Sequence, residues 1–258
     1  VDCMSPTGHT AFTTPIGLLE FVAKLREASG GKPVGFKLCV GSVRELFAIA
    51  KAMAETKLLP DFITVDGAEG GTGAAPVEFT NHIGMPLIEA LVLVHNTLVG
   101  VGVRDQLRII ASGKRVTGFD IATAMALGAD TCNVARGFMF SVGCIQSQLC
   151  HKNTCPVGVA TQNKHLQRAL DVDDKAQRAY YFHRNTVAAL AEVIAAGGLD
   201  HPSELQPHHI MQRVGLNEVR TLDRVYDFFE PGQLLDGSPP DFLQASWDAA
   251  RTDSFLPR

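Results

Sequence analysis

The sequence has few cysteines and no cluster of basic residues. Its 258 residues include six cysteines, which are too few and too unevenly spaced for a disulfide-stabilised scaffold. We therefore expect a reducing compartment, the cytoplasm. The basic residues are scattered along a chain of net charge −4, so they form no electrostatic surface for nucleic acid or for an anionic membrane. We expect neither as a partner.

The longest apolar stretch, residues 84–103, is interrupted by polar residues. Glu89, His95 and Asn96 are each costly to place in lipid, so we expect a buried helix and no membrane segment. At the N-terminus no basic segment precedes an apolar core, and we therefore predict no secretory signal. The first residue is Val1 rather than methionine, from which we expect further sequence upstream.

Short apolar runs alternate with segments of helical length, and 46% of all residues are hydrophobic. The runs predict four strands, at residues 34–40, 62–66, 107–111 and 131–135. Helices are predicted at residues 15–29, 42–57, 86–101 and 117–127. Alternation of this kind is typical of an α/β protein with a parallel sheet.

The four predicted βα units end near residue 140, whereas a closed (β/α)8 TIM barrel needs eight such units. We therefore expect the C-terminal half of a barrel, whose partner is the missing N-terminal half. Such a half leaves two exposed edge strands, so we expect it to be unstable alone or to assemble with another copy or with its missing half.

A helical C-terminal extension is expected beyond Cys155. Its predicted helices are a long one at residues 174–196 and short ones at 203–214 and 216–229. The expected domains are residues 1–230, which hold the barrel half with a metal-binding loop at 144–155, and a turn-rich, loosely held tail at 231–258.

Candidate functional residues follow the predicted strands, since a parallel barrel carries its functional groups at the carboxyl ends of its strands. Lys37 lies in an otherwise apolar strand. Its side chain either extends to the barrel mouth as a structural lysine or stabilises negative charge on a flavin ring or an oxyanion.

The loop after the second strand is rich in glycine, with four glycines among the seven residues from 67 to 73. Such a loop either makes a tight connection or lets backbone amides approach a ligand closely. Asp66 and Glu69 lie beside these glycines at the strand end, which favours a ligand.

Glycine and a basic residue occur together after each of the last two predicted strands. Ser112 is followed by Gly113 and Lys114, and Arg136 is followed by Gly137. A barrel builds its phosphate site at these strand ends, from backbone amides and a cation. Ordinary turns with surface charges are the alternative.

Three cysteines, Cys144, Cys150 and Cys155, lie within twelve residues and are followed by Pro156. Three thiolates on a short segment suit an iron–sulfur cluster, whose irons are held by cysteine sulfur. His151 could instead complete a zinc site, and buried cysteines without metal are a further alternative.

The cysteine motif, the glycine-rich loop at 70–74 and the Lys37 strand resemble the FMN-binding synthase domain of glutamate synthase, in particular its short, single-domain bacterial and archaeal type. The resemblance covers roughly residues 14–214. It implies a (β/α)8 domain that binds FMN, with a 3Fe-4S cluster held by Cys144, Cys150 and Cys155. It also implies reductive formation of L-glutamate from 2-oxoglutarate and ammonia.

By this resemblance Lys37 is the site lysine near the flavin and the 2-oxo acid. We expect Lys37 and Glu69 to be the catalytic residues. Together with the strand-end pattern, the resemblance gives the residues expected to bind FMN: Lys37, Asp66, Gly70, Gly71, Thr72, Gly73, Ser112, Gly113, Lys114, Arg136 and Gly137.

The chain also departs from the large enzymes of this family. Cys3 is not placed as the nucleophile of a glutaminase domain, so we expect the nitrogen to come from free ammonia, from ammonia that a partner glutaminase makes from glutamine, or from another amine such as methylamine. The sequence carries no dinucleotide-binding fingerprint, so we expect ferredoxin or a separate reductase subunit as the electron donor. The rival functions are another flavin barrel, which leaves the cysteines unexplained, and a non-catalytic electron-transfer or structural metal module.

Overall fold

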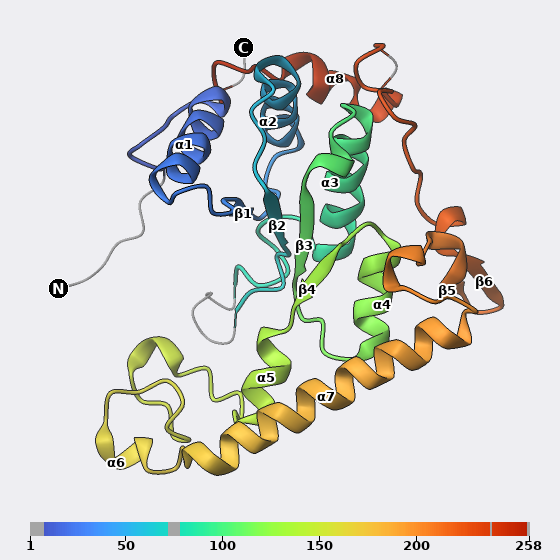
Figure 1. The fold of residues 1–258 in the computed structure, drawn as a ribbon. Helices are drawn as coiled ribbons and strands as arrows, with labels where there is room; N and C mark the ends of the chain where they lie inside the picture. The colour runs from blue at the N-terminus through green and yellow to red at the C-terminus, as the bar shows by residue number, and fades with distance from the viewer. Residues whose placement is uncertain (1–7, 72–77, 238, 257–258) are drawn as a thin grey trace.

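A computed structural model describes residues 8–71, 78–237 and 239–256 (Figure 1). Its helices are α1 (Pro15–Ala28), α2 (Val43–Thr56), α3 (Leu87–Gly100), α4 (Gly118–Ala126), α5 (Ala135–Ser141), α6 (Lys164–Gln167), α7 (Val172–Ala196) and α8 (Asp241–Ala249). Its strands are β1 (Phe36–Leu38), β2 (Phe62–Asp66), β3 (Arg108–Ser112), β4 (Thr131–Asn133), β5 (Met211–Gly215) and β6 (Glu218–Thr221). Short 3-10 turns occur at Arg104–Gln106, Cys150–Lys152, Pro202–Glu204, Pro207–His209 and Leu222–Arg224.

The strands β1 to β4 form one parallel sheet in consecutive order. This order places each strand beside the one that follows it in sequence, with a helix in each connection. All four predicted strands and all four predicted helices around them are present, so the α/β class with a parallel sheet is confirmed. Within the described residues, β1 and β4 each keep one unpaired edge.

One face of this sheet belongs to the hydrophobic core. Ile63, Val65, Ile109 and Ala111 alternate along β2 and β3, and each is at most 1% exposed. They pack in one cluster with side chains of α2 and α3, among them Phe47, because alternate residues of a strand point to the same face. The residues between them point to the opposite face, which we call the open face.

The apolar stretch expected to be a buried helix is confirmed as α3. Leu87, Ala90, Leu91 and Val94 of this helix are fully buried. In the part of the chain that the structure describes, no helix combines the length and the apolar character that crossing a bilayer requires.

The prediction of short helices at 203–214 and 216–229 is wrong. Residues Met211–Gly215 and Glu218–Thr221 instead form an antiparallel hairpin, β5 with β6. Nearly all residues of the hairpin are exposed, so its apolar residues do not form the buried face of a helix. Gly215, next to the turn, together with the β-branched Val214 and Val219, is the composition of a hairpin.

The tail expected to be loosely held is also different. The helix α8 packs against α2, and Trp247 meets Phe47 in an edge-to-face contact with ring centroids 5.3 Å apart. Leu234 is 1% exposed, and the amide of Ile16 in α1 donates to the carbonyl of Thr252 at 3.1 Å. The glycines and prolines of this segment predict turns, but Leu234 and Trp247 are buried and anchor it to the core.

Candidate functional site

Lys37 and Asp66 meet on the open face. The Nζ atom of Lys37 lies 2.8 Å from Oδ2 of Asp66, and their side chains are 61% and 33% exposed. Lys37 pairs in register with Thr64, so Asp66 lies two residues further along β2, on the same face and at the carboxyl end. The arrangement holds a cation at the strand ends, where it could stabilise negative charge on a bound molecule.

A row of polar side chains continues across the carboxyl ends of three strands. Asp66 pairs in register with Ser112, and Ser112 pairs with Asn133. We call Asp66, Ser112 and Asn133 the polar row. Lys37, Asp66 and Ser112 were predicted to be site residues and do lie together, whereas Asn133 was missed. The fourth strand was predicted to end at Ala135, and its actual last residue is Asn133.

The glycine-rich loop is described only up to Gly71, so Thr72 and Gly73 lie outside the described residues. Gly70 has a φ of 73°, in the left-handed region that favours glycine. Arg136 donates from its guanidinium to the carbonyl of Gly71 at 2.9 Å. This bond joins the loop after β2 to the start of α5, as expected if both belong to one site.

Glu69 does not share the open face with Lys37. Its Oε1 atom accepts a hydrogen bond from the amide of Leu87, the first residue of α3, at 2.9 Å. Its Oε2 atom is buried without a hydrogen-bond partner among the described residues. The catalytic role expected for Glu69 stays a prediction.

The loop after β3 is shaped by its neighbours. Lys114 has a φ of 46°, and its Nζ atom lies 3.5 Å from Oδ1 of Asn81, which belongs to the preceding connection. Gly113 lies against Leu87, where a Cβ atom would come within 3.0 Å of the leucine Cβ. Two basic residues, Lys114 and Arg136, thus extend from successive strand ends towards the glycine-rich connection.

Gly137 lies in the first turn of α5 rather than in a loop. A Cβ atom at this position would lie 2.5 Å from Cζ of Phe182 in α7. Close packing of α5 against α7 therefore accounts for this glycine, and its predicted contact with a phosphate stays a prediction.

The three cysteines occupy the irregular segment between α5 and α7, which lies apart from the sheet (Figure 1). Although its burial opposes ionisation, the backbone amides of Ala160, Val157 and Val159 hold the pKa of Cys155 below its ordinary value. The amide of Gln146 donates to Sγ of Cys144 at 3.5 Å. The amides around Cys155 favour its thiolate form, so the donor chemistry at that residue fits a thiolate-bound metal. Within the described residues, no three histidine, cysteine or acidic side chains are grouped to hold a metal ion. The sulfurs of the three cysteines therefore do not come together at one metal position.

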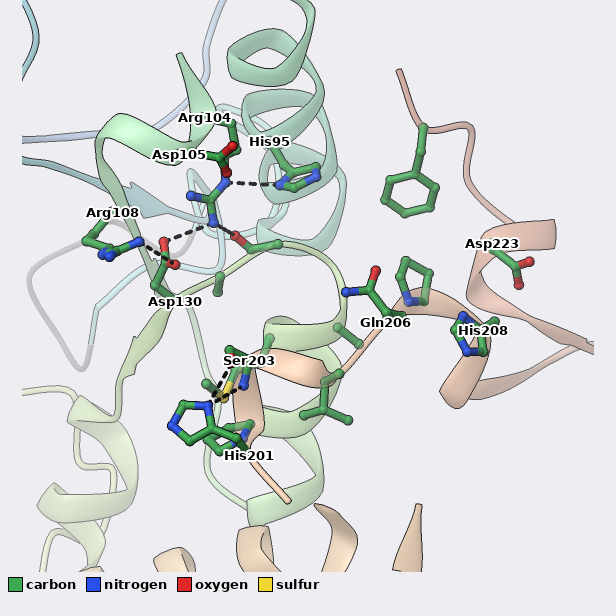
Figure 2. A pocket seen from close by; sticks show the side chains of 18 residues that line it. His95, Arg104, Asp105, Arg108, Asp130, His201, Ser203, Gln206, His208 and Asp223 are labelled. Carbon is green, nitrogen blue, oxygen red and sulfur yellow. Dashed lines mark hydrogen bonds and ion pairs between the residues drawn. The ribbon is translucent and has the colours of Figure 1, made fainter. Parts of the chain in front are cut away.

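A cavity of about 640 Å³ lies at the other end of the sheet, beside the amino ends of β3 and β4 (Figure 2). Arg104 crosses it, donating to Asp130 at 2.9 Å, to the carbonyl of Gly128 at 2.8 Å and to Nδ1 of His95 at 3.2 Å. Burial and the adjacent Arg104 lower the pKa of His95 to about 4. None of the predicted site residues lines this cavity.

Residues 1–200 match a family described as a conserved region in glutamate synthase. The glutamate synthase large subunit-like protein YerD of Bacillus subtilis (strain 168) is 42% identical over 225 residues, which cover 87% of this chain and 43% of that protein. An archaeal glutamate synthase (NADPH) of Methanocaldococcus jannaschii is 33% identical over 219 residues, covering 84% of this chain and 42% of that protein.

A crystal structure of a mandelate oxidase variant with 2-hydroxy-phenylacetamide aligns with 73% of this chain and 41% of its own, at 18% identity and a TM-score of 0.42. That likeness is too weak to establish a shared fold. The chain spans less than half the length of the two curated relatives. The match over residues 1–200 and the identity to YerD establish that this chain belongs to the family of the glutamate synthase conserved region.

Proposed function

We propose that this chain forms part of a glutamate synthase-like oxidoreductase. It would make L-glutamate from 2-oxoglutarate and ammonia by reductive amination, with FMN and a 3Fe-4S cluster as cofactors. The observation that carries the proposal is the Lys37–Asp66 pair at 2.8 Å, exposed at the carboxyl ends of parallel strands beside the rest of the polar row. Family membership and the names of the relatives give the substrate class.

The sheet is proposed to be the C-terminal half of a (β/α)8 barrel. In support, each of the four strands neighbours the next in sequence, as in a barrel, and the sheet has unpaired edges within the described residues. Four further units would complete the sheet and enclose the open face. The relatives, more than twice as long as the matched part, have room for them.

The residues present fit a flavin mononucleotide. The open face offers an exposed cation, Lys37, and hydrogen-bonding groups along the polar row, while Lys114 and Arg136 extend from the adjacent strand ends. Lys37 would bind the flavin ring and the carboxylates of the 2-oxo acid, and the two basic residues would bind the phosphate. Bound FMN would supply hydride transfer to the substrate carbon.

Within this site, Lys37 would stabilise negative charge that develops during the reaction, and Asp66 would hold the lysine in position. Asn133 and Ser112 would orient polar groups of the substrate or of the flavin. The part of the molecule that encloses the open face would exclude water from the site.

Cys144, Cys150 and Cys155 would hold the cluster, which supplies single electrons. Closing such a site requires the segment between α5 and α7 to draw its sulfurs together. The electrons would come from ferredoxin or a reductase subunit, and the NADPH in the name of the Methanocaldococcus relative favours a reductase. The nitrogen would come from free or glutamine-derived ammonia.

The proposal is tested on protein purified without oxygen, by measuring FMN and iron on one sample. We expect bound FMN with about three irons per flavin, the iron content of such a cluster. Replacing Lys37 by methionine should slow oxidation of the reduced flavin by 2-oxoglutarate and ammonia by about 100-fold, because a charge-stabilising group is lost. Lys24→Met, on the exposed surface of α1, is the matched control and should leave the rate unchanged. Zinc in place of iron, protein without flavin, or equal rates in the two variants would contradict the proposal.

A further inference from the structure

We infer that Glu69 is a positioning residue whose carboxylate locks the loop after β2 to the loop after β3 and so fixes Asp66 and Ser112 on the open face. The inference concerns the geometry of the strand ends, and its expected effect on FMN rests on the proposed function. A positioning role of this kind differs from the catalytic role that the sequence predicts for Glu69.

The first part of the lock is the start of α3. Pro86, at the N-cap position, has no side-chain acceptor, so the first turn of the helix depends on another residue for its cap. Glu69 supplies it from 18 positions earlier, accepting from the amide of Leu87 at 2.9 Å. A carboxylate at this end of a helix is also stabilised by the helix dipole.

The second part is a slot between two glycines. The Oε2 atom of Glu69 occupies the space that a Cβ atom at Gly67 would take, and a Cβ atom at Gly113 would lie 2.8 Å from it. Neither glycine has a φ in the left-handed region, so backbone conformation does not explain them. The carboxylate and Leu87, whose backbone nitrogen would lie 2.7 Å from a Cβ atom at Gly67, together leave no room for a side chain at either position.

The slot lies where the ends of β2 and β3 meet. Gly67 directly follows Asp66 and Gly113 directly follows Ser112, and the amide of Gly67 donates to the carbonyl of Ser112 at 2.8 Å. A displaced Glu69 carboxylate would therefore shift both strand ends. Because Asp66 holds Lys37, the displacement would reach the cation of the open face.

The burial of the Glu69 carboxylate lowers the stability of the protein. The Oε2 atom of Glu69 is buried without a hydrogen-bond partner in the described residues. A buried, unpaired polar atom destabilises a protein, and such exceptions to local rules concentrate at functional sites. Glu69 therefore contributes to the geometry of the strand ends beyond what it contributes to stability.

The first test measures FMN affinity by titration of the flavin-free protein. Glu69→Ala removes the cap and empties the slot, and we expect affinity to fall by about tenfold, with a changed flavin absorption spectrum. Glu69→Gln keeps an acceptor for Leu87 and should lose less. Glu20→Gln, on the exposed face of α1, is the matched control and should bind FMN like the unaltered protein. An unchanged affinity in Glu69→Ala, with or without loss of stability, would overturn the positioning role.

The second test needs no flavin and uses a double-mutant cycle on the free energy of unfolding. Gly113→Ala should be strongly destabilising when Glu69 is present and much less so in the Glu69→Ala background, because the clash with Oε2 disappears. The new methyl group would also lie 3.0 Å from Cβ of Leu87, so part of the destabilisation is expected in both backgrounds. Additive effects would overturn the lock. If even the unaltered protein binds no FMN, the proposed function fails, and this cycle still decides the inference.

Discussion

At the scale of single residues, position on a strand decides which side chains can act together. Lys37, Asp66 and Ser112 come from three separate segments of the sequence, and the parallel register brings them to one face and one end of the sheet. Their meeting could be predicted because carboxyl ends of parallel strands share an edge. Asn133 could not, because the exact last residue of a short strand depends on where its hydrogen bonds stop.

His95 is expected to make stability depend on pH. Its folded pKa of about 4 lies below the ordinary value of 6.5, so the unfolded chain binds the additional proton between these values. Stability is therefore lost as the pH falls through this window, by about 2 kcal/mol between pH 7 and pH 5. Urea unfolding of the protein and of His95→Gln at both values measures this loss.

The glutamine variant isolates the contribution of the histidine, since glutamine still offers an acceptor to Arg104 and does not titrate. Its stability should fall less than that of the unaltered protein over the same range, by the same 2 kcal/mol or so. Equal losses in the two proteins would show that His95 is not the titrating group.

At the scale of elements, the helices and strands of the parallel sheet were predictable, and so was the largely exposed helix α7, expected at 174–196 and present at Val172–Ala196. The β5–β6 hairpin and α8 were not predicted. The spacing of apolar residues in α3 and β2 indicates a buried helix and a buried strand, and both elements lie where they were expected. The hairpin of β5 and β6 is exposed, so its apolar residues carry no burial pattern, and propensity alone was misread. Gly137 was misassigned for a different reason, since its contact with Phe182 comes from a helix some 45 residues away.

The helix α8 gives the prediction at this scale. Trp247 is 9% exposed, packs edge-to-face on Phe47, and has the Nζ atom of Lys51 4.4 Å from its ring centroid. Trp247→Ala should therefore lower the free energy of unfolding by about 3–5 kcal/mol, the range found for a buried aromatic residue. Chemical denaturation checks the value.

Phe242, on the same helix, is 76% exposed and serves as the matched control. Phe242→Ala should change the free energy of unfolding by no more than about 0.5 kcal/mol. If both substitutions have the same small effect, the end of the chain is the loosely held tail that its composition suggested, and α8 does not stabilise the protein.

At the scale of the whole molecule, one face of the sheet is an ordinary core and the other carries charged and polar groups. The buried face could be read from the alternation of apolar residues in β2 and β3. The segments that pair with the edges of β1 and β4 and cover the open face could not be predicted from this sequence. A strand edge pairs through backbone groups, which are the same for every residue type and so leave no pattern in the sequence. We propose that these segments are the remaining units of a barrel, which would turn the open face into the wall of an enclosed site.

Reductive amination by this protein is decided by the oxidation of the reduced, flavin-loaded protein under anaerobic conditions. On mixing with 2-oxoglutarate and isotopically labelled ammonia, we expect the flavin absorption to recover and the label to appear in L-glutamate, one molecule for each flavin reoxidised. Recovery that requires both compounds would assign the reaction to reductive amination. A flavin that stays reduced in their presence, or reoxidises without labelled glutamate, would rule out glutamate synthesis at this site.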